Sequence, residues 1–167
     1  MNRLILLAAV MLTAAPALAD VQVRFIESAP KDRFEITNLA ACPLRKTDVT
    51  IDLSGSAAGL IFDVTGSGPG VEVFQPFDLV SGADALSKLP DVVDGDTAVT
   101  LKISELGPNQ RLAFTIDVDD TAGRREITVS GSEISGAVIS VADGLTTNSA
   151  TFDATRTALV TTTRCTS

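Results

Sequence analysis

The chain has 167 residues, of which 45% are hydrophobic, and 21 acidic against 13 basic side chains give it a formal net charge of −8. This length suits one domain with a full core, and the acidic balance disfavours nucleic acid and anionic membrane surfaces as partners. The chain contains no His, Trp or Tyr, which excludes Ser–His–Asp and Cys–His catalysis, His-ligated zinc and the usual general base near neutral pH. We therefore expect a protein that is not an enzyme.

The first nineteen residues have the three parts of a secretory signal peptide. Arg3 precedes an apolar run from Leu4 to Leu12, and an Ala-x-Ala sequence ends at Ala19. The apolar run is too short for a membrane anchor, which needs roughly 20 residues. We expect residues 1–19 to be removed as a signal peptide. Residues 20–167 would then form a single secreted or periplasmic domain, without membrane insertion.

The remaining chain alternates apolar and polar residues with the period of two that is typical of half-buried strands. Only the segment from Gly82 to Leu89 looks briefly helical. Sequences rich in Gly, Pro and Asp separate the expected strands and indicate turns. The expected strands cover residues 21–26, 33–37, 49–54, 99–104, 112–118, 127–129, 138–141, 151–153 and 158–162. Short strands at this spacing predict an all-β fold, an antiparallel β-sandwich that is Ig-like or jelly-roll-like.

The two cysteines, Cys42 and Cys165, are expected to form one disulfide, because the signal peptide indicates an oxidising compartment. Closing a loop of this length contributes about 4–5 kcal/mol in the chain-entropy description of disulfides. Two free thiols are the alternative.

The acidic run Asp117-Val118-Asp119-Asp120 is the main candidate for a metal site. If the run is one strand, Asp117 and Asp119 project from the same face, and Asp94 and Asp96 would join them if their loop lay nearby. Ca²⁺ takes six to eight oxygen ligands, so these five carboxylates are candidate ligands, although the EF-hand spacing is missing. The alternative is a solvated surface whose charges prevent aggregation at a sheet edge. No cofactor other than Ca²⁺ is expected.

Residues 32–42, with the sequence Asp-Arg-Phe-Glu-Ile-Thr-Asn-Leu-Ala-Ala-Cys, resemble exported bacterial domains described as aggregation factor core, after the sponge aggregation factors. The resemblance continues through residues 49–64 and 70–77. The resemblance to the sponge proteins implies calcium-dependent, glycan-linked cell adhesion. This chain departs from them in being one short domain without repeats, and no functional residue is carried across.

These observations predict a secreted or surface-associated adhesion or aggregation module that is not an enzyme. It would depend on calcium if the acidic loops meet, and its partner would be an unknown protein or glycan on a surface. The alternative is a structural subunit of a secreted fibre or envelope assembly, joined by strand addition at Ala158 to Thr163. A hydrolase using a carboxylate pair is a third hypothesis, which the lack of aromatic subsites disfavours.

Overall fold

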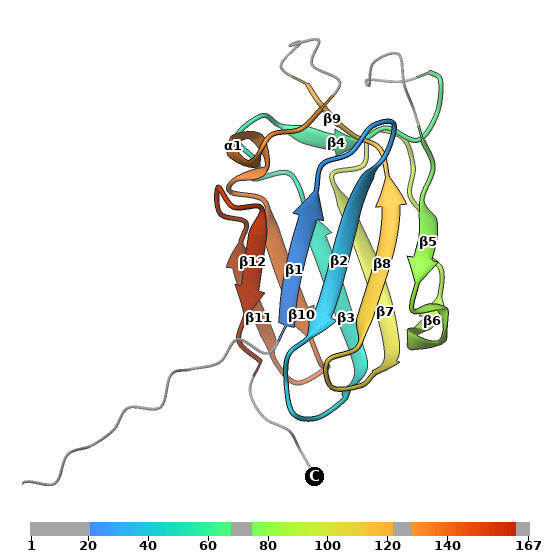
Figure 1. Ribbon diagram of the computed structural model, residues 1–167, viewed down its shortest axis with the longest axis vertical. Helices are drawn as coiled ribbons and strands as arrows, with labels where there is room; N and C mark the ends of the chain where they lie inside the picture. The colour runs from blue at the N-terminus through green and yellow to red at the C-terminus, as the bar shows by residue number, and fades with distance from the viewer. Residues whose placement is uncertain (1–20, 68–74, 122–127, 163–167) are drawn as a thin grey trace, which may run out of the picture.

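The computed structural model describes residues 21–67, 75–121 and 128–162. Two five-stranded antiparallel sheets pack against each other, and a two-stranded sheet lies across one end of the sandwich (Figure 1). The predicted antiparallel β-sandwich is therefore confirmed. Within the described residues, no helix has the length and hydropathy needed to cross a membrane.

The strands of the two large sheets come from all parts of the described chain. From edge to edge, sheet A consists of β12 (Thr157–Val160), β1 (Val21–Ile26), β2 (Asp32–Asn38), β8 (Arg111–Ile116) and β5 (Asp78–Ser81). Sheet B consists of β11 (Thr147–Thr151), β10 (Val138–Ala142), β3 (Leu44–Asp52), β7 (Ala98–Leu106) and β6 (Leu86–Lys88). The small sheet pairs β4 (Leu60–Phe62) with β9 (Val118–Asp120), and the helical turns are η1 (Ala83–Ala85) and α1 (Gly131–Ile134).

A cluster of buried phenylalanines lies at the centre of the core. The ring of Phe34 in β2 stacks on Phe114 of β8 at 5.2 Å and lies 5.1 Å from Phe25 of β1. It also contacts Phe62 of the small sheet at 6.4 Å and Phe152 at 6.5 Å. Such rings bury much apolar area and favour tilted or offset contacts, so one residue joins sheet A, the small sheet and the segment after β11.

The predicted helical segment from Gly82 to Leu89 is wrong in most of its length. Only the three residues of η1 form a helical turn, and β6 then pairs with β7, with Leu86 opposite Ile103. Conversely, α1 was not predicted, although its capping box is visible in the sequence. The main-chain N–H of Ser130 donates to the Glu133 carboxylate at 2.7 Å, as the Ser-x-x-Glu spacing requires.

The predicted strand over residues 112–118 is divided at Asp117. Its first part is β8, whereas Val118 leaves sheet A and pairs with Phe62 in the small sheet. Two other expected strands differ from the structure. The segment 151–153 is the end and the continuation of β11, and Thr128 and Val129 lie outside any strand.

The predicted disulfide between Cys42 and Cys165 stays a prediction. Cys42 lies in the connection between β2 and β3, and Cys165 lies outside the described residues. The predicted signal peptide, residues 1–19, also lies outside the described residues.

Candidate functional site

Five aspartates gather at the end of the sandwich that carries the small sheet, and we call this group the acidic pole: Asp32, Asp63, Asp94, Asp117 and Asp119. Asp63 directly follows β4, and Asp117 lies between β8 and β9. Because β4 and β9 pair, with Ile61 opposite Asp119, these segments lie side by side. Asp94 comes from the connection between β6 and β7, and Asp32 begins β2.

Main-chain hydrogen bonds fix the backbone of the acidic pole. The N–H of Asp63 donates to the carbonyl oxygen of Asp117 at 3.1 Å. Gln75 links the same two residues, since its N–H donates to the Asp63 carbonyl at 3.2 Å and its carbonyl accepts from the Asp117 N–H at 3.1 Å. The side chains therefore project from a framework that is held by backbone pairing on both sides.

Asp63 is the most deeply buried carboxylate of the pole, with 1% of its surface exposed. Within the described residues, neither of its side-chain oxygens has a hydrogen-bond partner that donates to it. Burial, the nearby Asp94 carboxyl group, with which it can share a proton, and the charge of Asp119 raise the pKa of Asp63 to about 6. Asp63 is therefore shielded from solvent and surrounded by other acidic side chains.

Asp94 faces Asp63 but has a different environment. Its Oδ1 atom accepts the main-chain N–H groups of Val64 at 3.0 Å and Thr65 at 3.1 Å. The bond from Val64 is the largest cause of a lowered Asp94 pKa. Its other oxygen, Oδ2, is buried and has no hydrogen-bond partner within the described residues. The lowered pKa keeps Asp94 ionised.

Asp117 and Asp32 complete the pole on the side of sheet A. Burial, followed by the negative charges of Asp63 and Asp119, raises the pKa of Asp117 to about 7. Burial is also the main reason that the pKa of Asp32 rises to about 7, and the charges of Asp117 and Glu27 add to it. The Asp32 carboxylate accepts the N–H groups of Ser28 and Val118, each at 3.3 Å, so it ties β2 to β9.

The structure brings together three of the five predicted metal ligands, Asp94, Asp117 and Asp119, around Asp63. Asp96 is used within its own turn, where its Oδ2 atom accepts the N–H of Val93 at 2.8 Å. Asp120 lies opposite Leu60 in the small sheet. The expectation that Asp117 and Asp119 share one face of a single strand is wrong, because the strand ends before Asp117.

Asp63 and Asp32 were missed by sequence reasoning. Asp63 is a single acidic residue after Leu-Ile-Phe, and Asp32 stands just before the strand expected over residues 33–37, so neither position carries a local pattern. The carboxylates also do not form a finished ligand shell. In the described part of the chain, no three Asp, Glu, Cys or His side chains have the spacing of a metal site.

Comparisons with protein-family models, with curated proteins and with solved structures find no match to this chain. The resemblance to aggregation factor core domains therefore stays a prediction.

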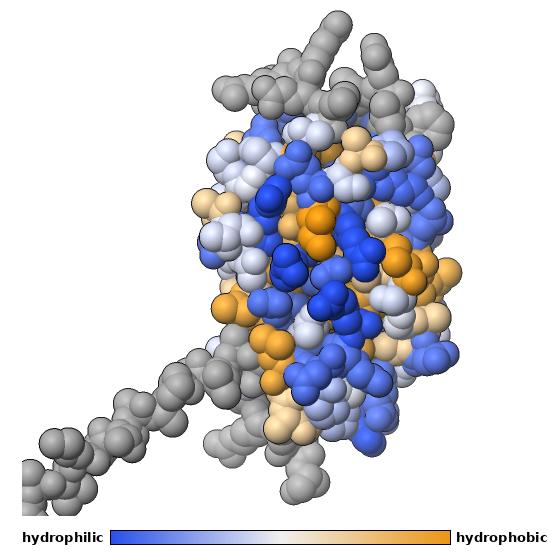
Figure 2. Space-filling model, in the orientation of Figure 1, coloured by the Kyte–Doolittle hydropathy of each residue, from blue (hydrophilic) through white to orange (hydrophobic). Residues whose placement is uncertain are grey.

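A second cluster of charges lies on the outer side of sheet A. Glu35 of β2 is surrounded by Arg33 at 3.0 Å, Arg111 of β8 at 3.1 Å and Arg24 of β1 at 3.9 Å. The Glu35 side chain is only 7% exposed, whereas those of Arg24 and Arg111 are each 51% exposed. We call this surface the arginine face. Figure 2 shows it as a group of strongly hydrophilic side chains over β1, β2 and β8, with separate hydrophobic groups between and beside them.

Strand register explains why these charges meet. Arg24 lies directly opposite Glu35, and Arg33 lies two residues before Glu35 on the same strand and therefore on the same face. Ala113 is the partner of Glu35 on β8, and Arg111 lies two residues before it. The small Ala113 side chain leaves room for the long arginine side chains to reach one carboxylate.

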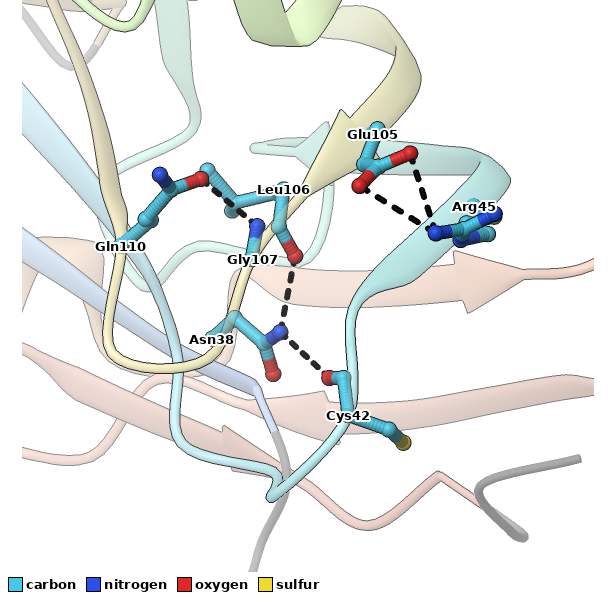
Figure 3. A network of polar contacts seen from close by, with 7 residues as sticks. All are labelled: Asn38, Cys42, Arg45, Glu105, Leu106, Gly107 and Gln110. Atoms are coloured by element: carbon cyan, nitrogen blue, oxygen red, sulfur yellow. Dashed lines mark hydrogen bonds and ion pairs between the residues drawn. The ribbon is translucent and has the colours of Figure 1, made fainter. Parts of the chain in front are cut away.

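The opposite end of the sandwich is a closed polar network (Figure 3). The buried Asn38 amide donates to the carbonyl oxygens of Cys42 at 2.8 Å and Leu106 at 2.9 Å, and its Oδ1 atom accepts the N–H of Ala40 at 3.0 Å. All three polar contacts of this side chain stay within the fold. Asn38 therefore joins the β2–β3 connection to the end of β7 and is a structural residue.

Proposed function

We propose that this chain is an exported adhesion module without enzymatic activity, and that it binds an acidic surface glycan through the arginine face. The observation that carries the proposal is the excess of positive charge at Glu35. Three arginines share one carboxylate, on a protein whose formal net charge is −8. At the edge of the same sheet, Lys31 and Asp78 form an ion pair that adds no net charge.

The geometry of the face suits a linear polyanion. Arg24 and Arg111 lie on β1 and β8, the strands on either side of β2, so about 10 Å separates their strands. Guanidinium groups bind carboxylates and sulfates through two parallel N–H donors. A chain of uronic or sulfated sugars would present such groups repeatedly, and both arginines are half exposed and able to reach them.

A folded protein partner fits this face less well. Stable protein interfaces depend on large apolar or aromatic anchors near their centre. Here the centre is occupied by Glu35, Ala113 and the arginines, and the exposed apolar side chains Val80 and Leu159 lie on the two edge strands. Attraction by charge, without an anchor, is typical of polyanion binding.

Export is the first condition of this function. The signal peptide predicted at residues 1–19 should be removed after Ala19, so the protein recovered outside the cytoplasm should begin at Asp20. Intact mass measurement of the exported protein tests this directly. Recovery of a chain that begins at Met1 would contradict both the signal peptide and the proposed location.

Binding to heparin, a sulfated uronic-acid polymer, tests the proposal, with polyglutamate as a second probe that represents acidic polypeptides. We expect heparin to bind at about 50 mM salt, and affinity to fall steeply as salt rises, because screening weakens contacts between exposed charges. The double variant Arg24→Gln and Arg111→Gln should bind at least about tenfold more weakly, since each lost contact contributes roughly 1 kcal/mol. The matched control is Arg45→Gln, which removes an exposed arginine paired with Glu105 on sheet B.

Each result of this experiment has a clear meaning. Heparin binding that the double variant loses and Arg45→Gln keeps would support the arginine face. No binding by the folded wild-type protein, or equal loss in Arg45→Gln, would overturn the proposal. Tighter binding of polyglutamate than of heparin would replace the glycan by an acidic protein partner.

A structural subunit joined by strand addition is the second candidate function. One observation favours it: β12 is an edge strand of sheet A and pairs only with β1 within the described residues. A neighbouring chain could add a strand at this edge through main-chain hydrogen bonds. Light scattering at high protein concentration should then show assemblies that grow with concentration, and a strict monomer would exclude this function.

A further inference from the structure

We infer that the acidic pole is a calcium site, in which the carboxylates of Asp63, Asp94, Asp117 and Asp119 hold one Ca²⁺ ion between the small sheet and the β6–β7 connection. The inference concerns the end of the sandwich and does not depend on the arginine face. It also revises the predicted ligand set, because Asp63 becomes the central ligand and Asp96 and Asp120 are left out.

The unpartnered oxygens of the pole are the main observation. Both oxygens of Asp63, together with Oδ2 of Asp94 and Oδ2 of Asp117, are buried and have no hydrogen-bond partner within the described residues. Native proteins rarely leave even one buried polar atom without a partner, and a buried carboxylate without a counter-charge is especially unfavourable. Four such oxygens in three neighbouring carboxylates are suited to binding a cation.

Main-chain contacts bring the residues that carry these oxygens close together. Asp63 interacts with the Asp94 carboxyl group, and the hydrogen bond from the Asp63 N–H to the Asp117 carbonyl places Asp63 and Asp117 side by side. Asp119 lies on the neighbouring strand β9, opposite Ile61 of β4. Ile61 is two residues before Asp63 in the chain. The Asp94-Gly95 turn is fixed separately, by the N–H of Gly95 donating to the Phe62 carbonyl at 2.9 Å.

The donor chemistry selects the ion. All candidate ligands are carboxylate oxygens, which suit hard cations such as Ca²⁺ and Mg²⁺ and do not suit zinc or copper. The four side chains come from three separate segments, and within the described residues they do not have the spacing of a finished metal site. Ca²⁺ tolerates six to eight ligands in irregular geometry, whereas Mg²⁺ demands a near-ideal octahedron, so the pole favours Ca²⁺.

Calcium titration of chelator-treated protein, followed by isothermal titration calorimetry, tests the inference without any adhesion partner. We expect one Ca²⁺ per chain, weaker binding of Mg²⁺ and a rise of several degrees in the melting temperature when calcium is in large excess over its dissociation constant. Asp63→Asn and Asp117→Asn should each weaken calcium binding at least about tenfold. Asp91→Asn is the matched control, because Asp91 is an exposed carboxylate in the same connection as Asp94.

The melting temperature in EDTA separates a metal ligand from a structural residue. Without calcium, Asp63→Asn should raise the melting temperature, because it removes a buried charge that lacks a partner; with calcium, the wild-type protein should become the more stable of the two. A folded wild-type protein that shows no calcium heat and no calcium-dependent melting shift would overturn the inference. So would an Asp63→Asn variant that binds calcium as the wild type does, or that is less stable than the wild type in both buffers.

The two proposals can be rejected independently of each other. If the wild-type protein binds heparin but not calcium, only the calcium site is rejected. If the wild-type protein binds calcium but not heparin, only the adhesion function is rejected.

Discussion

The main-chain N–H of Asp63 donates a 3.1 Å hydrogen bond to the carbonyl oxygen of Asp117, although 54 positions separate the two residues in the chain. The bond places two buried carboxylates beside each other, and the negative charge of Asp63 contributes to the raised pKa of Asp117. One backbone contact between β4 and the end of β8 thereby concentrates charge at one end of the sandwich, where three carboxyl groups have a pKa near neutrality.

The raised pKa values predict an unusual dependence of stability on pH in EDTA. Asp32, Asp63 and Asp117 bind protons more tightly when folded, with pKa values of about 7, 6 and 7, than when unfolded, near 3.8. The folded state therefore holds more protons between these values, so the free energy of unfolding should fall as pH rises from about 4 to 7 and level off above that range. Urea unfolding at pH 5 and pH 8 measures the difference.

The charged neighbours of these groups support the direction of this effect. Among the described residues, the charges that act on Asp117 are those of Asp63 and Asp119, and those that act on Asp32 belong to Asp117 and Glu27, all of them negative. Asp117→Asn should reduce the pH dependence. Asp94, Asp143 and Asp153 have lowered pKa values, so they change the free energy of unfolding only below about pH 4. They do not affect its change between about pH 4 and 7. A stability that increases from pH 5 to pH 8 in EDTA would contradict the prediction.

Glu35 should be more important for stability than any single arginine around it. Glu35→Gln removes the negative charge that three guanidinium groups share, so the arginines would repel one another and lose their ion pairs. We expect a loss of about 1–3 kcal/mol in the free energy of unfolding, measured by urea denaturation. Arg24→Gln is the control, because its 3.9 Å contact is half exposed and should contribute less than about 1 kcal/mol. Equal losses in both variants would contradict this ranking.

Asn38→Ala should destabilise the end of the sandwich opposite the acidic pole. The change removes the donor to the Cys42 and Leu106 carbonyls and the acceptor for the Ala40 N–H (Figure 3). Buried main-chain groups left without partners should cost about 3 kcal/mol in total, measured by urea unfolding. Gln110→Ala, which removes an exposed bond to the Gly107 N–H, should cost less than about 1 kcal/mol. A mild Asn38→Ala variant would show that water replaces the lost contacts.

Gly136→Ala should be strongly destabilising because two backbones approach closely beside α1. Gly136 has φ 92°, and a Cβ atom there would lie 2.5 Å from the carbonyl oxygen of Gly55. We expect a loss of about 3 kcal/mol from the combined strain and clash. Gly144→Ala separates the two causes, since Gly144 has φ 85° but open space around it, and should cost about 1 kcal/mol. Similar melting temperatures for the two variants would contradict a clash at Gly136.

Local sequence patterns were sufficient for the main strands of the sandwich. Residues 21–26 match β1, residues 33–37 lie within β2 and residues 138–141 lie within β10. Each has apolar side chains at alternate positions, and a strand of this kind is stable only when that face is covered. Weak patterns failed, as in β6, where three residues become a strand only because β7 lies beside them.

The sequence by itself determined that this chain is acidic, lacks histidine and folds as an antiparallel sandwich, because composition and period-two alternation are properties of single residues and their near neighbours. Only the tertiary structure decided which charged side chains meet. Asp63 joins Asp117 through the pairing of β4 with β9, and Glu35 meets three arginines through the register of β1, β2 and β8. Contacts of this kind join residues far apart in the chain, and their positions depend on how the whole core packs, which no local pattern records.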